Sequence, residues 1–516
     1  MKVEFEVREF AIGERRDAEL LADMWNASDS GWPMGWTRGV PETAERILER
    51  TQKFDRIAIF VVEANGEILG YGDLERTRGR DDSAYLNLLN VRPDFHGKGL
   101  GKALILKILE RTIEKGYKQL TIGTWGGNKK SVPLYKKTGF FWVPDTSVFM
   151  QNYIPTILGM PVAKEFFSKH DWYLCFKREL EAIPDDIEWN GIKVFPYRFE
   201  EDGEFFTVWI DNKAQAPTAI ETDDLYIACC TGKEEIICGL EHKLRWEIAN
   251  KKGEKPLNVT LIAQSENNIG LNVAENFTVD DRLVIEKTFI LPSDIKPKEE
   301  GLAEHQIKSL LLINGVPLTL GTAVKPVQPI DIQFTASMFV SGKPNEKVVV
   351  NIKNNLDFSV NGELFIAPEA SLKFDRFKDN FSIESKSWAS FDFYLKINGE
   401  GAFSTKMQAV CLPEMNRNFI SGNLPLKTKA KRVYFLTQPL DSVYSWYNEE
   451  GKVITVESPT IWVRVNLRGG DIEINERSRG NMVFWHRNSS LGPPFIDYEV
   501  PSIYEYRMEH KDGKIS

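Results

Sequence analysis

The sequence predicts a multidomain protein in which an α/β (α+β) domain with a mixed central sheet precedes all-β sandwich domains. Three observations lead to this prediction. The chain has 516 residues, which is more than a single hydrophobic core organises. Strand-like and helical patterns alternate along roughly the first third of the chain. From Glu188 onward, short alternating strands are separated by Gly, Asn and Pro, and helical runs are few.

The composition restricts the partners and the compartment. The hydrophobic fraction of 42% is ordinary for a soluble globular protein. The net charge of −9 gives no general electrostatic reason to expect binding to nucleic acid or to an anionic membrane. Residues 1–8 alternate like a strand and lack the apolar core of a signal peptide, and no apolar run reaches transmembrane length. We therefore expect a cytoplasmic protein with no nucleic-acid or membrane partner.

The five cysteines are Cys175, Cys229, Cys230, Cys238 and Cys411, and most of them lie in apolar, strand-like segments. Their odd number and their setting argue against a disulfide framework and favour buried, reduced thiols. A metal site at Cys229, Cys230 and Cys238 is a poor alternative because no histidine cluster accompanies them. We expect no metal.

The first half of the α/β domain is expected to contain one strand, two helices and a β-hairpin. Alternation and helical periodicity place these elements, in order, at residues 3–10, 17–25, 41–51 and 57–78. The hairpin turn is assigned to Asn65-Gly66 because both central residues of such a turn need positive φ. The second half is expected to contain strands at 118–124 and 140–143, with a helix around Tyr135 between them.

The centre of this domain is a glycine-rich turn between a strand and a helix. Residues 85–91 are rich in Leu and Val, and residues 99–115 carry apolar side chains at helical spacing. Between these elements, Gly97, Gly99 and Gly101 leave the backbone without side chains. Its N–H groups can approach an anion at the positive end of the helix, so the pattern predicts a diphosphate site.

Two other nucleotide-binding devices do not fit this turn. The dinucleotide fingerprint follows a first strand and precedes a ribose-binding acid, whereas this turn lies far into the chain. The nucleotide P-loop requires Gly-Lys-Ser or Gly-Lys-Thr, and neither follows the turn.

The turn resembles the pyrophosphate turn of the GNAT acyltransferases, Gln/Arg-x-x-Gly-x-Gly/Ala behind Val-x-Pro. The chain has Val91-Arg92-Pro93 and then His96-Gly97-Lys98-Gly99-Leu100-Gly101, with His96 where the family usually has Gln or Arg. Residues 128–140 also match the family's second pattern, Asn-x-x-Ser/Ala-x-x-Leu/Phe-Tyr-x-x-x-Gly-Phe. The resemblance implies a GNAT fold over residues 1–182, in which the strand before the turn splays away from its neighbour.

The resemblance also implies the reaction. A GNAT enzyme transfers an acyl group, usually acetyl, directly from coenzyme A to an amine, so acetyl-CoA is the expected co-substrate. The acceptor is expected to be a small-molecule or peptide amine. No covalent enzyme intermediate is needed, and three tasks remain: holding the thioester, removing a proton from the amine and protonating the departing thiolate.

The residues expected to hold the cofactor are those of the matched motifs. Amides of the turn would bind the pyrophosphate, the edge of the preceding strand would pair with the pantetheine arm, and a polar side chain would contact the arm or the adenine side. The positions are Leu89, Val91, His96, Gly97, Lys98, Gly99, Gly101, Lys102, Asn128 and Tyr135.

Two residues are expected to be catalytic. Tyr135 is the candidate general acid, because a phenol can donate a proton to the departing thiolate. The strand before the turn carries no carboxylate, so the base is sought on the preceding strand. There, alternation places Asp73 and Glu75 on one face. We predict that Glu75 is the base, acting through water. A packing role for Tyr135 and a solvated surface role for Glu75 are the alternatives.

The acceptor site is expected near the loop 26–38, which covers this end of the cleft in GNAT folds. Trp32 and Trp36 would provide an apolar wall, and Asp73 would provide a polar contact. The alternative is a loop whose aromatic side chains only cover the core. An insertion at 153–170 is expected to form a helical cover that either closes this site or seats the domain on the β-rich part of the chain. Residues 171–178 would then form a last strand.

The remaining chain is predicted to contain two immunoglobulin-like sandwiches, at 188–325 and 326–412, and a β-rich segment at 413–516. The last segment loosely resembles a mutarotase-like supersandwich and is expected to be incomplete. These modules would present the acceptor, form a homo-oligomer or contact carbohydrate. Two competing functions stay open: a sensor that binds acyl-CoA without transfer, and a carbohydrate-binding protein acting through its β modules.

Overall fold

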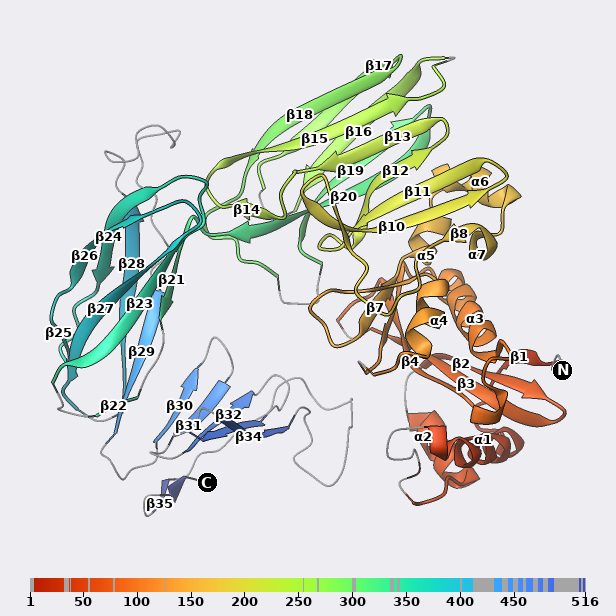
Figure 1. Ribbon diagram of the computed structural model, residues 1–516, viewed down its shortest axis with the longest axis horizontal. Coiled ribbons are helices and arrows are strands. Elements are labelled where there is room, and N and C mark those ends of the chain that lie inside the picture. The colour runs from red at the N-terminus through yellow and green to blue at the C-terminus, as the bar shows by residue number, and fades with distance from the viewer. Residues whose placement is uncertain are drawn as a thin grey trace. The chain divides into compact units, whose positions relative to one another are not determined.

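The computed structural model divides the chain into two compact units, Met1–Pro326 and Val327–Ser516. We describe each unit by itself (Figure 1). The residues that the structure describes are 4–31, 37, 39–53, 56–77, 79–125, 127–253, 255–266, 269–298, 303–334, 338–340, 344–399, 401–411, 431–438, 444–448, 453–457, 461–466, 472–476, 481–486, 510–511 and 514–515.

The first unit begins with a seven-stranded mixed sheet in the order β1-β2-β3-β4-β5-β7-β6. Its strands are β1 (Glu6–Glu9), β2 (Arg56–Ala64), β3 (Glu67–Arg76), β4 (Ser83–Val91), β5 (Gln119–Gly123), β6 (Phe140–Trp142) and β7 (Phe149–Asn152). Neighbouring strands are antiparallel, except that β4 runs parallel to β5. The predicted mixed sheet is confirmed.

Helices cover both faces of this sheet. Helices α1 (Arg15–Ala27) and α2 (Ala44–Lys53) pack on one face, in an apolar cluster that contains Ile59, Val61 and Tyr71. Helix α3 (Leu100–Glu114) packs on the other face, with Phe60, Val62 and Leu86. The alternation of buried side chains along β2 therefore divides them between two cores. Helix α4 (Ser131–Lys137) comes after β5, as expected.

The insertion after β7 forms short helices that seat the domain on the strands of the first sandwich. They are α5 (Ile154–Leu158), η3 (Pro161–Ala163) and α6 (Lys164–Lys169). Figure 1 shows α5 and α6 near β10 (Ile192–Glu201) and β11 (Glu204–Asp211). Ile157 and Phe166 share one apolar cluster with Phe199 and Phe206 of those strands. Of the two roles expected for the insertion, the structure supports seating.

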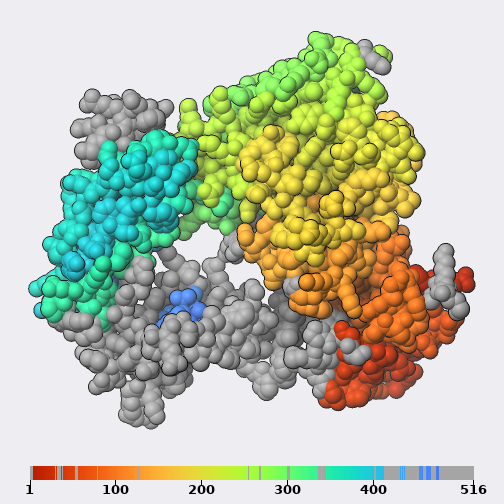
Figure 2. All heavy atoms as spheres, viewed as in Figure 1, coloured from red at the N-terminus to blue at the C-terminus, as the bar shows by residue number. Residues whose placement is uncertain are grey.

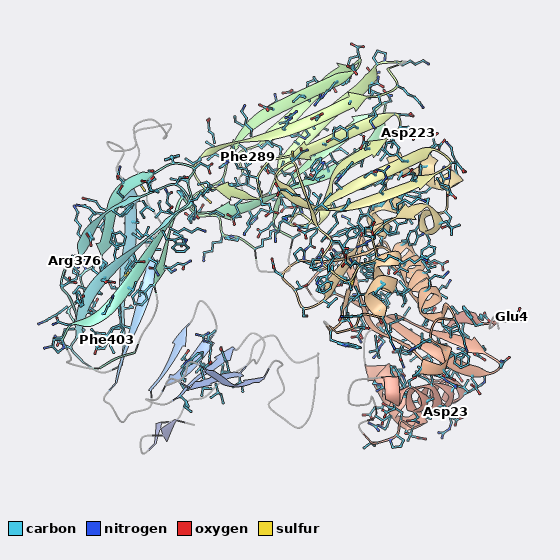
Figure 3. All side chains as sticks on the ribbon, in the orientation of Figure 1. Glu4, Asp23, Asp223, Phe289, Arg376 and Phe403 are labelled. Carbon is cyan, nitrogen blue, oxygen red and sulfur yellow. The ribbon has the colours of Figure 1, made fainter. Side chains whose placement is uncertain are left out.

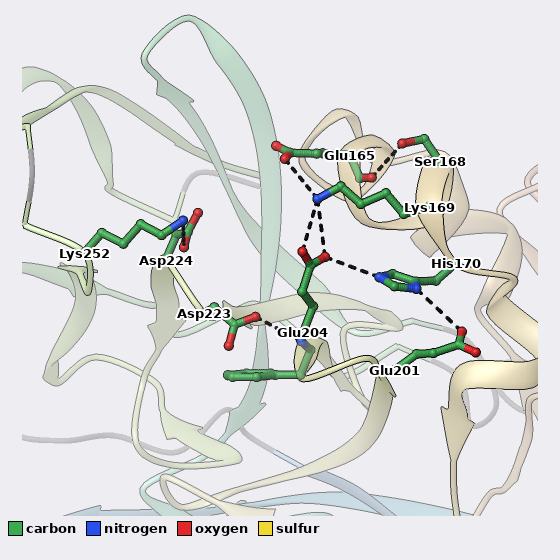
Figure 4. A network of polar contacts seen from close by, with 10 residues as sticks. Glu165, Ser168, Lys169, His170, Glu201, Glu204, Asp223, Asp224 and Lys252 are labelled. Carbon is green, nitrogen blue, oxygen red and sulfur yellow. Dashed lines mark hydrogen bonds and ion pairs between the residues drawn. The ribbon is translucent and has the colours of Figure 1, made fainter.

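Charged side chains tie the end of the insertion to the same strands (Figure 4). His170 lies between two carboxylates, with Nε2 at 3.3 Å from Glu204 and Nδ1 at 3.6 Å from Glu201. Lys169 contacts Glu204 at 3.3 Å and Glu165 at 3.5 Å. The His170 side chain is only 8% exposed, so this contact belongs to the buried interface between the insertion and the sandwich.

Residues 171–178 differ from the expected strand. The Asp171 side chain accepts the N–H groups of Tyr173 and Leu174, which caps the short helix α7 (Trp172–Cys175). Only Phe176–Lys177 is extended, and this strand, β8, pairs with β10 of the sandwich. The expectation of a last α/β strand here was wrong because a capping aspartate precedes the segment and its edge pairs with the sandwich.

The rest of the first unit is a two-sheet sandwich. One sheet has eight strands, β18-β15-β13-β12-β11-β10-β8 with β9 beside β10, and the other has five, β14-β20-β19-β16-β17. Bonds cross between the sheets, as from Trp246 Nε1 to Ser309 Oγ at 2.9 Å, and Phe289 (Figure 3) is buried in the shared core. The strands are β9 (Ile187–Trp189), β10 (Ile192–Glu201), β11 (Glu204–Asp211), β12 (Ala216–Thr222), β13 (Leu225–Cys230), β14 (Glu235–Ile237), β15 (Glu241–Asn250), β16 (Leu257–Ser265), β17 (Asn272–Val279), β18 (Arg282–Ile290), β19 (His305–Ile313) and β20 (Val316–Val327).

The second unit contains a second pair of sheets, β21-β23-β27-β25 and β22-β29-β28-β24-β26. Phe435 of one sheet contacts Phe334 and Phe374 of the other, at 5.2 and 5.8 Å between ring centroids. The strands are β21 (Ile330–Phe334), β22 (Met338–Val340), β23 (Glu346–Asn354), β24 (Val360–Ile366), β25 (Leu372–Phe374), β26 (Lys378–Ile383), β27 (Trp388–Ile397), β28 (Gly401–Cys411) and β29 (Lys431–Gln438).

Two further sheets complete this unit. The larger has the order β30-β31-β32-β33-β34, and β35 pairs with β36. The strands are β30 (Tyr444–Asn448), β31 (Val453–Glu457), β32 (Ile461–Asn466), β33 (Ile472–Glu476), β34 (Asn481–His486), β35 (His510–Lys511) and β36 (Lys514–Ile515). The expected β-rich architecture is confirmed. The immunoglobulin-like class, the domain boundaries and the supersandwich remain predictions, and residues 491–495 of that resemblance lie outside the described residues.

All five cysteines are free and buried, as expected. No helix among the described residues has both the length and the apolar composition needed to cross a bilayer. Within the same residues, no cluster of His, Cys, Asp and Glu is suited to hold a metal ion.

Candidate active site

The central feature of the site is an opening between β4 and β5. These strands pair only at Ser83–Tyr85 with Gln119–Thr121. Beyond this point β4 remains paired with β3, while β5 is paired with β7. The two parallel strands therefore diverge from Leu86 onward, as the resemblance implied, and leave the facing edge of β4 available to an extended ligand.

An extra residue in β4 bends the strand at this opening. Asp73 lies opposite Leu88 and Leu74 lies opposite Leu86, so Asn87 is skipped in the register with β3. This is the pattern of a β-bulge, which redirects a side chain. Asn87 Nδ2 donates to Asp73 Oδ2 at 3.3 Å and to Glu75 Oε1 at 3.0 Å.

The glycine turn connects β4 to the start of α3 through the short helix η2 (Pro93–Phe95). Gly97 and Gly99 have φ of 75° and 89°, a left-handed backbone that disfavours any side chain. A Cβ at Gly101 would lie 3.3 Å from Leu134, so glycine here lets α3 approach α4. Gly99, which precedes the 15-residue helix α3, has no side chain to cap it, and the first N–H groups of the helix can bind an anion.

Charged side chains around the turn are held against aromatic rings. Lys98 Nζ lies 4.2 Å from the Phe95 ring centroid, and Lys102 Nζ lies 5.3 Å from that of Tyr173 in α7. These lysines place positive charge beside the turn, where it would favour phosphate.

His96 holds the end of β4. Arg92 N–H donates to Leu69 O on β3, so the Val91 carbonyl of the same trans peptide points the other way, toward the opening. His96 Nε2 contacts that carbonyl oxygen at 2.8 Å. This departure from the usual Gln or Arg thus places a ring at the cleft edge of β4.

Tyr135 is buried in the core between α3, α4 and the sheet, with 5% exposure. Burial raises the pKa of its phenol to about 12, and a hydrogen bond with the Ser131 side chain partly opposes this shift. Its ring meets that of Phe140 edge-on, at 6.1 Å between centroids. The phenol is therefore protonated at any physiological pH, as a general acid requires.

A second phenol, that of Tyr85, was not anticipated. The Tyr85 side chain reaches from β4 toward β5, and its hydroxyl would lie 3.3 Å from a Cβ placed on Gly123. It is close enough to Tyr135 for an electrostatic effect on the Tyr135 pKa. In the sequence, the feature that could have drawn attention to Tyr85 is its position in the strand before the glycine turn, two residues before Asn87.

The carboxylates lie on the α1–α2 face of the sheet. Arg56 Nε contacts Asp73 Oδ2 at 3.0 Å and Glu75 Oε1 at 3.7 Å. Asp73 is 1% exposed, and burial raises its pKa, an effect that Arg56 opposes. The Glu75 side chain is 27% exposed. Glu75 is thus the carboxylate that water can reach.

The other expected residues have these positions. Asn128 Nδ2 donates to Thr124 Oγ1 at 2.9 Å, and its Oδ1 accepts Ser131 N–H at 3.2 Å, so it caps α4. Leu89 and Val91 are partly buried against the core on the α3 side. Trp32 and Trp36 lie outside the described residues. Contact of any of these side chains with a cofactor or acceptor remains a prediction.

A separate groove of about 780 Å³ lies on the outer face of the eight-stranded sheet. Small side chains, including Ala228 and Cys230, form part of its lining. Its longer side chains pair with each other, as in Lys243–Glu286 at 2.7 Å and Arg245–Glu247 at 3.1 Å. These charges are thus engaged in surface pairs, and we place the chemistry at the β4–β5 opening instead.

Comparison with known proteins decides the family. Residues 21–140, which contain the opening and both motifs, match the model of the Acetyltransferase (GNAT) family. An acetyltransferase of Pectobacterium atrosepticum, ECA0875, is 30% identical over 131 residues, which are 25% of this chain and 84% of that protein. The chain belongs to the GNAT acetyltransferase family. The family prediction is thereby confirmed.

The chain is also similar to two further proteins. The spore coat polysaccharide biosynthesis protein SpsD of Bacillus subtilis is 32% identical over 80 residues. This match spans 16% of the present chain and only 27% of SpsD. The crystal structure of the PaiA N-acetyltransferase of Thermoplasma acidophilum, in complex with coenzyme A, is 20% identical and covers 29% of this chain and 99% of its own, with a TM-score of 0.24.

Proposed function

We propose that the GNAT domain transfers an acetyl group from acetyl-CoA to an amine by direct attack within a ternary complex. The observation that carries this proposal is the opening between β4 and β5, which has the glycine turn at one end. Tyr135 shares an apolar cluster with Leu86 of β4 and Ile122 of β5. Backbone groups for two phosphates, a strand edge that β5 leaves unpaired and a protonated phenol would then lie along one path.

The cofactor would be held mainly by backbone. The N–H groups from Gly97 to Lys102 lie at the positive end of α3 and would bind the pyrophosphate. The β4 edge at Leu89 and Val91 would pair with the amides of pantetheine, in place of pairing with β5. In this arrangement, the His96 ring and the pantetheine arm would both contact the carbonyl oxygen of Val91.

The chemistry would proceed in one displacement. The acceptor nitrogen loses a proton through water to Glu75 and attacks the thioester carbonyl carbon. A C–N bond forms and the C–S bond breaks. The phenol proton of Tyr135 then passes to the thiolate sulfur, giving an amide and coenzyme A with a free thiol. Exchange with solvent then returns a proton to Tyr135 and removes one from Glu75.

Asp73 is proposed to act from behind Glu75. Asp73 Oδ2 accepts hydrogen bonds from Arg56 and Asn87, and Asn87 also donates a hydrogen bond to Glu75. The buried carboxylate would thus fix the side chains around the base. The acceptor is proposed to be a small-molecule or peptide amine entering from the α1–α2 side, where Trp32 and Trp36 are expected. The β modules would present the acceptor or support assembly. We propose a cytoplasmic location, which five free cysteines support.

Two measurements test the proposal. Calorimetric titration with acetyl-CoA measures binding, and release of the coenzyme A thiol is then followed with a panel of amines. We expect saturable binding and amine-dependent thiol release. Binding without release for any amine would favour the alternative of an acyl-CoA sensor. Tyr135→Phe should lower turnover far more than it lowers cofactor affinity, and equal turnover in both proteins would remove the acid role.

A further inference from the structure

Helix α4, which carries Tyr135, also carries a buried lysine. The Lys136 side chain is 1% exposed, and its ammonium donates to the carbonyl oxygen of Ile183 at 2.8 Å and pairs with Asp185. Lysine is rarely buried to this extent unless it is paired. Both partners lie in the segment that leads from the GNAT domain into the first sandwich.

Asp185 is the centre of a buried cluster. Besides Lys136 it contacts Arg178 at 2.8 Å and accepts the backbone N–H of Trp142 at 2.9 Å. The Arg178 guanidinium lies 3.5 Å from the centroid of the Phe141 ring and donates to the carbonyl of Phe140. One carboxylate therefore holds α4, the strand β6 that comes after it and the segment before the sandwich.

A second contact comes from the sandwich itself. The Tyr197 hydroxyl, on β10, donates to the Gly139 carbonyl at 2.7 Å and accepts the N–H of Tyr153 at 2.9 Å. Gly139 ends the turn after α4 with φ of 97°, and a Cβ there would lie 2.7 Å from Ile154. The Phe141 ring packs against Tyr197 at 4.6 Å. In Figure 2 the orange and yellow parts of the first unit adjoin in one continuous surface.

These contacts decide where a short helix lies. Helix α4 has seven residues, too few to be stable in isolation, so tertiary contacts fix its position. Because Lys136 directly follows Tyr135, a displacement of one displaces the other. Buried ion pairs add little net stability over apolar packing, but their directional bonds specify a geometry.

We propose that Lys136 and its partner Asp185, together with Tyr197, are positioning residues that hold the Tyr135 phenol at the β4–β5 opening. The first sandwich is then a working part of the acetyltransferase and not only an appended module. This inference rests on the proposed function, since it assigns a purpose to the fixed position of the acid.

The test uses the full chain and the substitution Lys136→Met. Methionine keeps an unbranched side chain that is one atom shorter than that of lysine, and the remaining pair of Asp185 and Arg178 is electrically neutral. The matched control is Lys137→Met, the same change at the exposed neighbouring position of α4. We expect kcat of Lys136→Met to fall about ten- to a hundredfold, since small misplacements of catalytic groups cost this much. KM for acetyl-CoA should stay within about twofold, and Lys137→Met should equal the wild type.

A double-mutant cycle with Tyr135→Phe separates positioning from general loss of structure. If Lys136 acts through the phenol, Lys136→Met should cause no further loss of kcat once Tyr135 is Phe. Unchanged kcat in Lys136→Met, or losses that multiply in the double variant, would overturn the inference. If Lys136→Met does not fold, Tyr197→Phe, which removes one hydroxyl, takes its place in the same cycle with the same outcomes.

The proposed function fails in a different way. It falls if the wild type releases no thiol with any amine, or if Tyr135→Phe turns over like the wild type. The positioning inference alone falls if Tyr135→Phe is slow while the positioning variants are not.

Discussion

The two sides of the β4–β5 opening differ in the chemical groups that they provide. On the side proposed for the cofactor, the groups assigned to binding are backbone N–H groups of the glycine turn at the start of α3. On the side proposed for the acceptor, the groups assigned to catalysis are side chains of β3 and β4, joined through Asn87 and Arg56. The first side depends on local backbone conformation, and the second depends on which residues share a face and how far they are buried.

This difference teaches that affinity and turnover should respond to different substitutions. Changes to the turn alter the conformation of groups that would bind phosphate in both the ground state and the transition state. Changes on the acceptor side alter proton transfer, which matters only while bonds change. Four predictions, from the largest effect to the smallest, test this division.

The largest effect is expected for Glu75→Gln, which keeps the shape of the side chain and removes the base. General base catalysis contributes about 10²–10⁴-fold, so we expect kcat to fall about a hundredfold. KM for acetyl-CoA should not change, because Glu75 lies on the other side of the opening. Glu67→Gln, on the same strand with its side chain 62% exposed, is the control. A shift in cofactor affinity without loss of kcat would break the division.

The next effect is on stability. Asp73→Asn removes the nearer of the two carboxylates that contact the buried Arg56 in the described part of the chain, Asp73 at 3.0 Å and Glu75 at 3.7 Å. We expect the free energy of unfolding to fall by about 2–3 kcal/mol, since removing one partner of a buried ion pair is strongly destabilising. Urea denaturation measures this change. Asp94→Asn, which breaks a mostly exposed pair with Arg92, should have almost no effect. Equal losses for both variants would show that the acceptor side is not a buried network.

Gly99→Val tests the cofactor side. A β-branched residue at φ of 89° is strained, and relief of that strain would turn the N–H groups away from the phosphates. We expect the Kd for acetyl-CoA to rise about tenfold, the equivalent of the roughly 1–2 kcal/mol that such strain costs. At saturating acetyl-CoA, kcat should be retained. Gly203→Val, with φ of 82° in the turn between β10 and β11, controls for the strain alone. Weakened binding in that control would argue against a specific role of the turn.

The smallest effect concerns pH. Burial raises the pKa of Tyr135 to about 12, so the phenol keeps its proton well beyond the ordinary tyrosine range. At saturating substrates, we expect kcat to stay level between about pH 8 and pH 10, below that raised pKa. Tyr135→Phe should show the same profile at a lower level. A decline of wild-type kcat centred near about pH 10 would indicate that the acid is exposed to solvent.

The part of the site that could be predicted from sequence is the part made by neighbouring residues. The glycines at 97 and 99 indicate backbone positions with positive φ, and the spacing of apolar residues predicts the helix α3 after the turn. Contacts between distant residues were not readable in the same way. The bulge at Asn87 depends on the register between two strands. Lys136 is of a residue type that is ordinarily exposed, so the sequence gives no sign that it is buried. Residues 171–178 read as a strand, yet their pairing partner lies in the sandwich.

The sequence by itself determined the glycine turn, the helix after it and the helix that carries Tyr135, because glycine conformations and hydrophobic periods are encoded within a few residues. Its two motifs carried the resemblance that predicted the GNAT fold. Only the tertiary structure decided which carboxylate is reached by water, which phenol reaches across the opening, and how the sandwich holds α4. These features depend on packing between residues as far apart as Gly139 and Tyr197, 58 positions along the chain. Burial and bond direction at such contacts arise only when the whole first unit has folded.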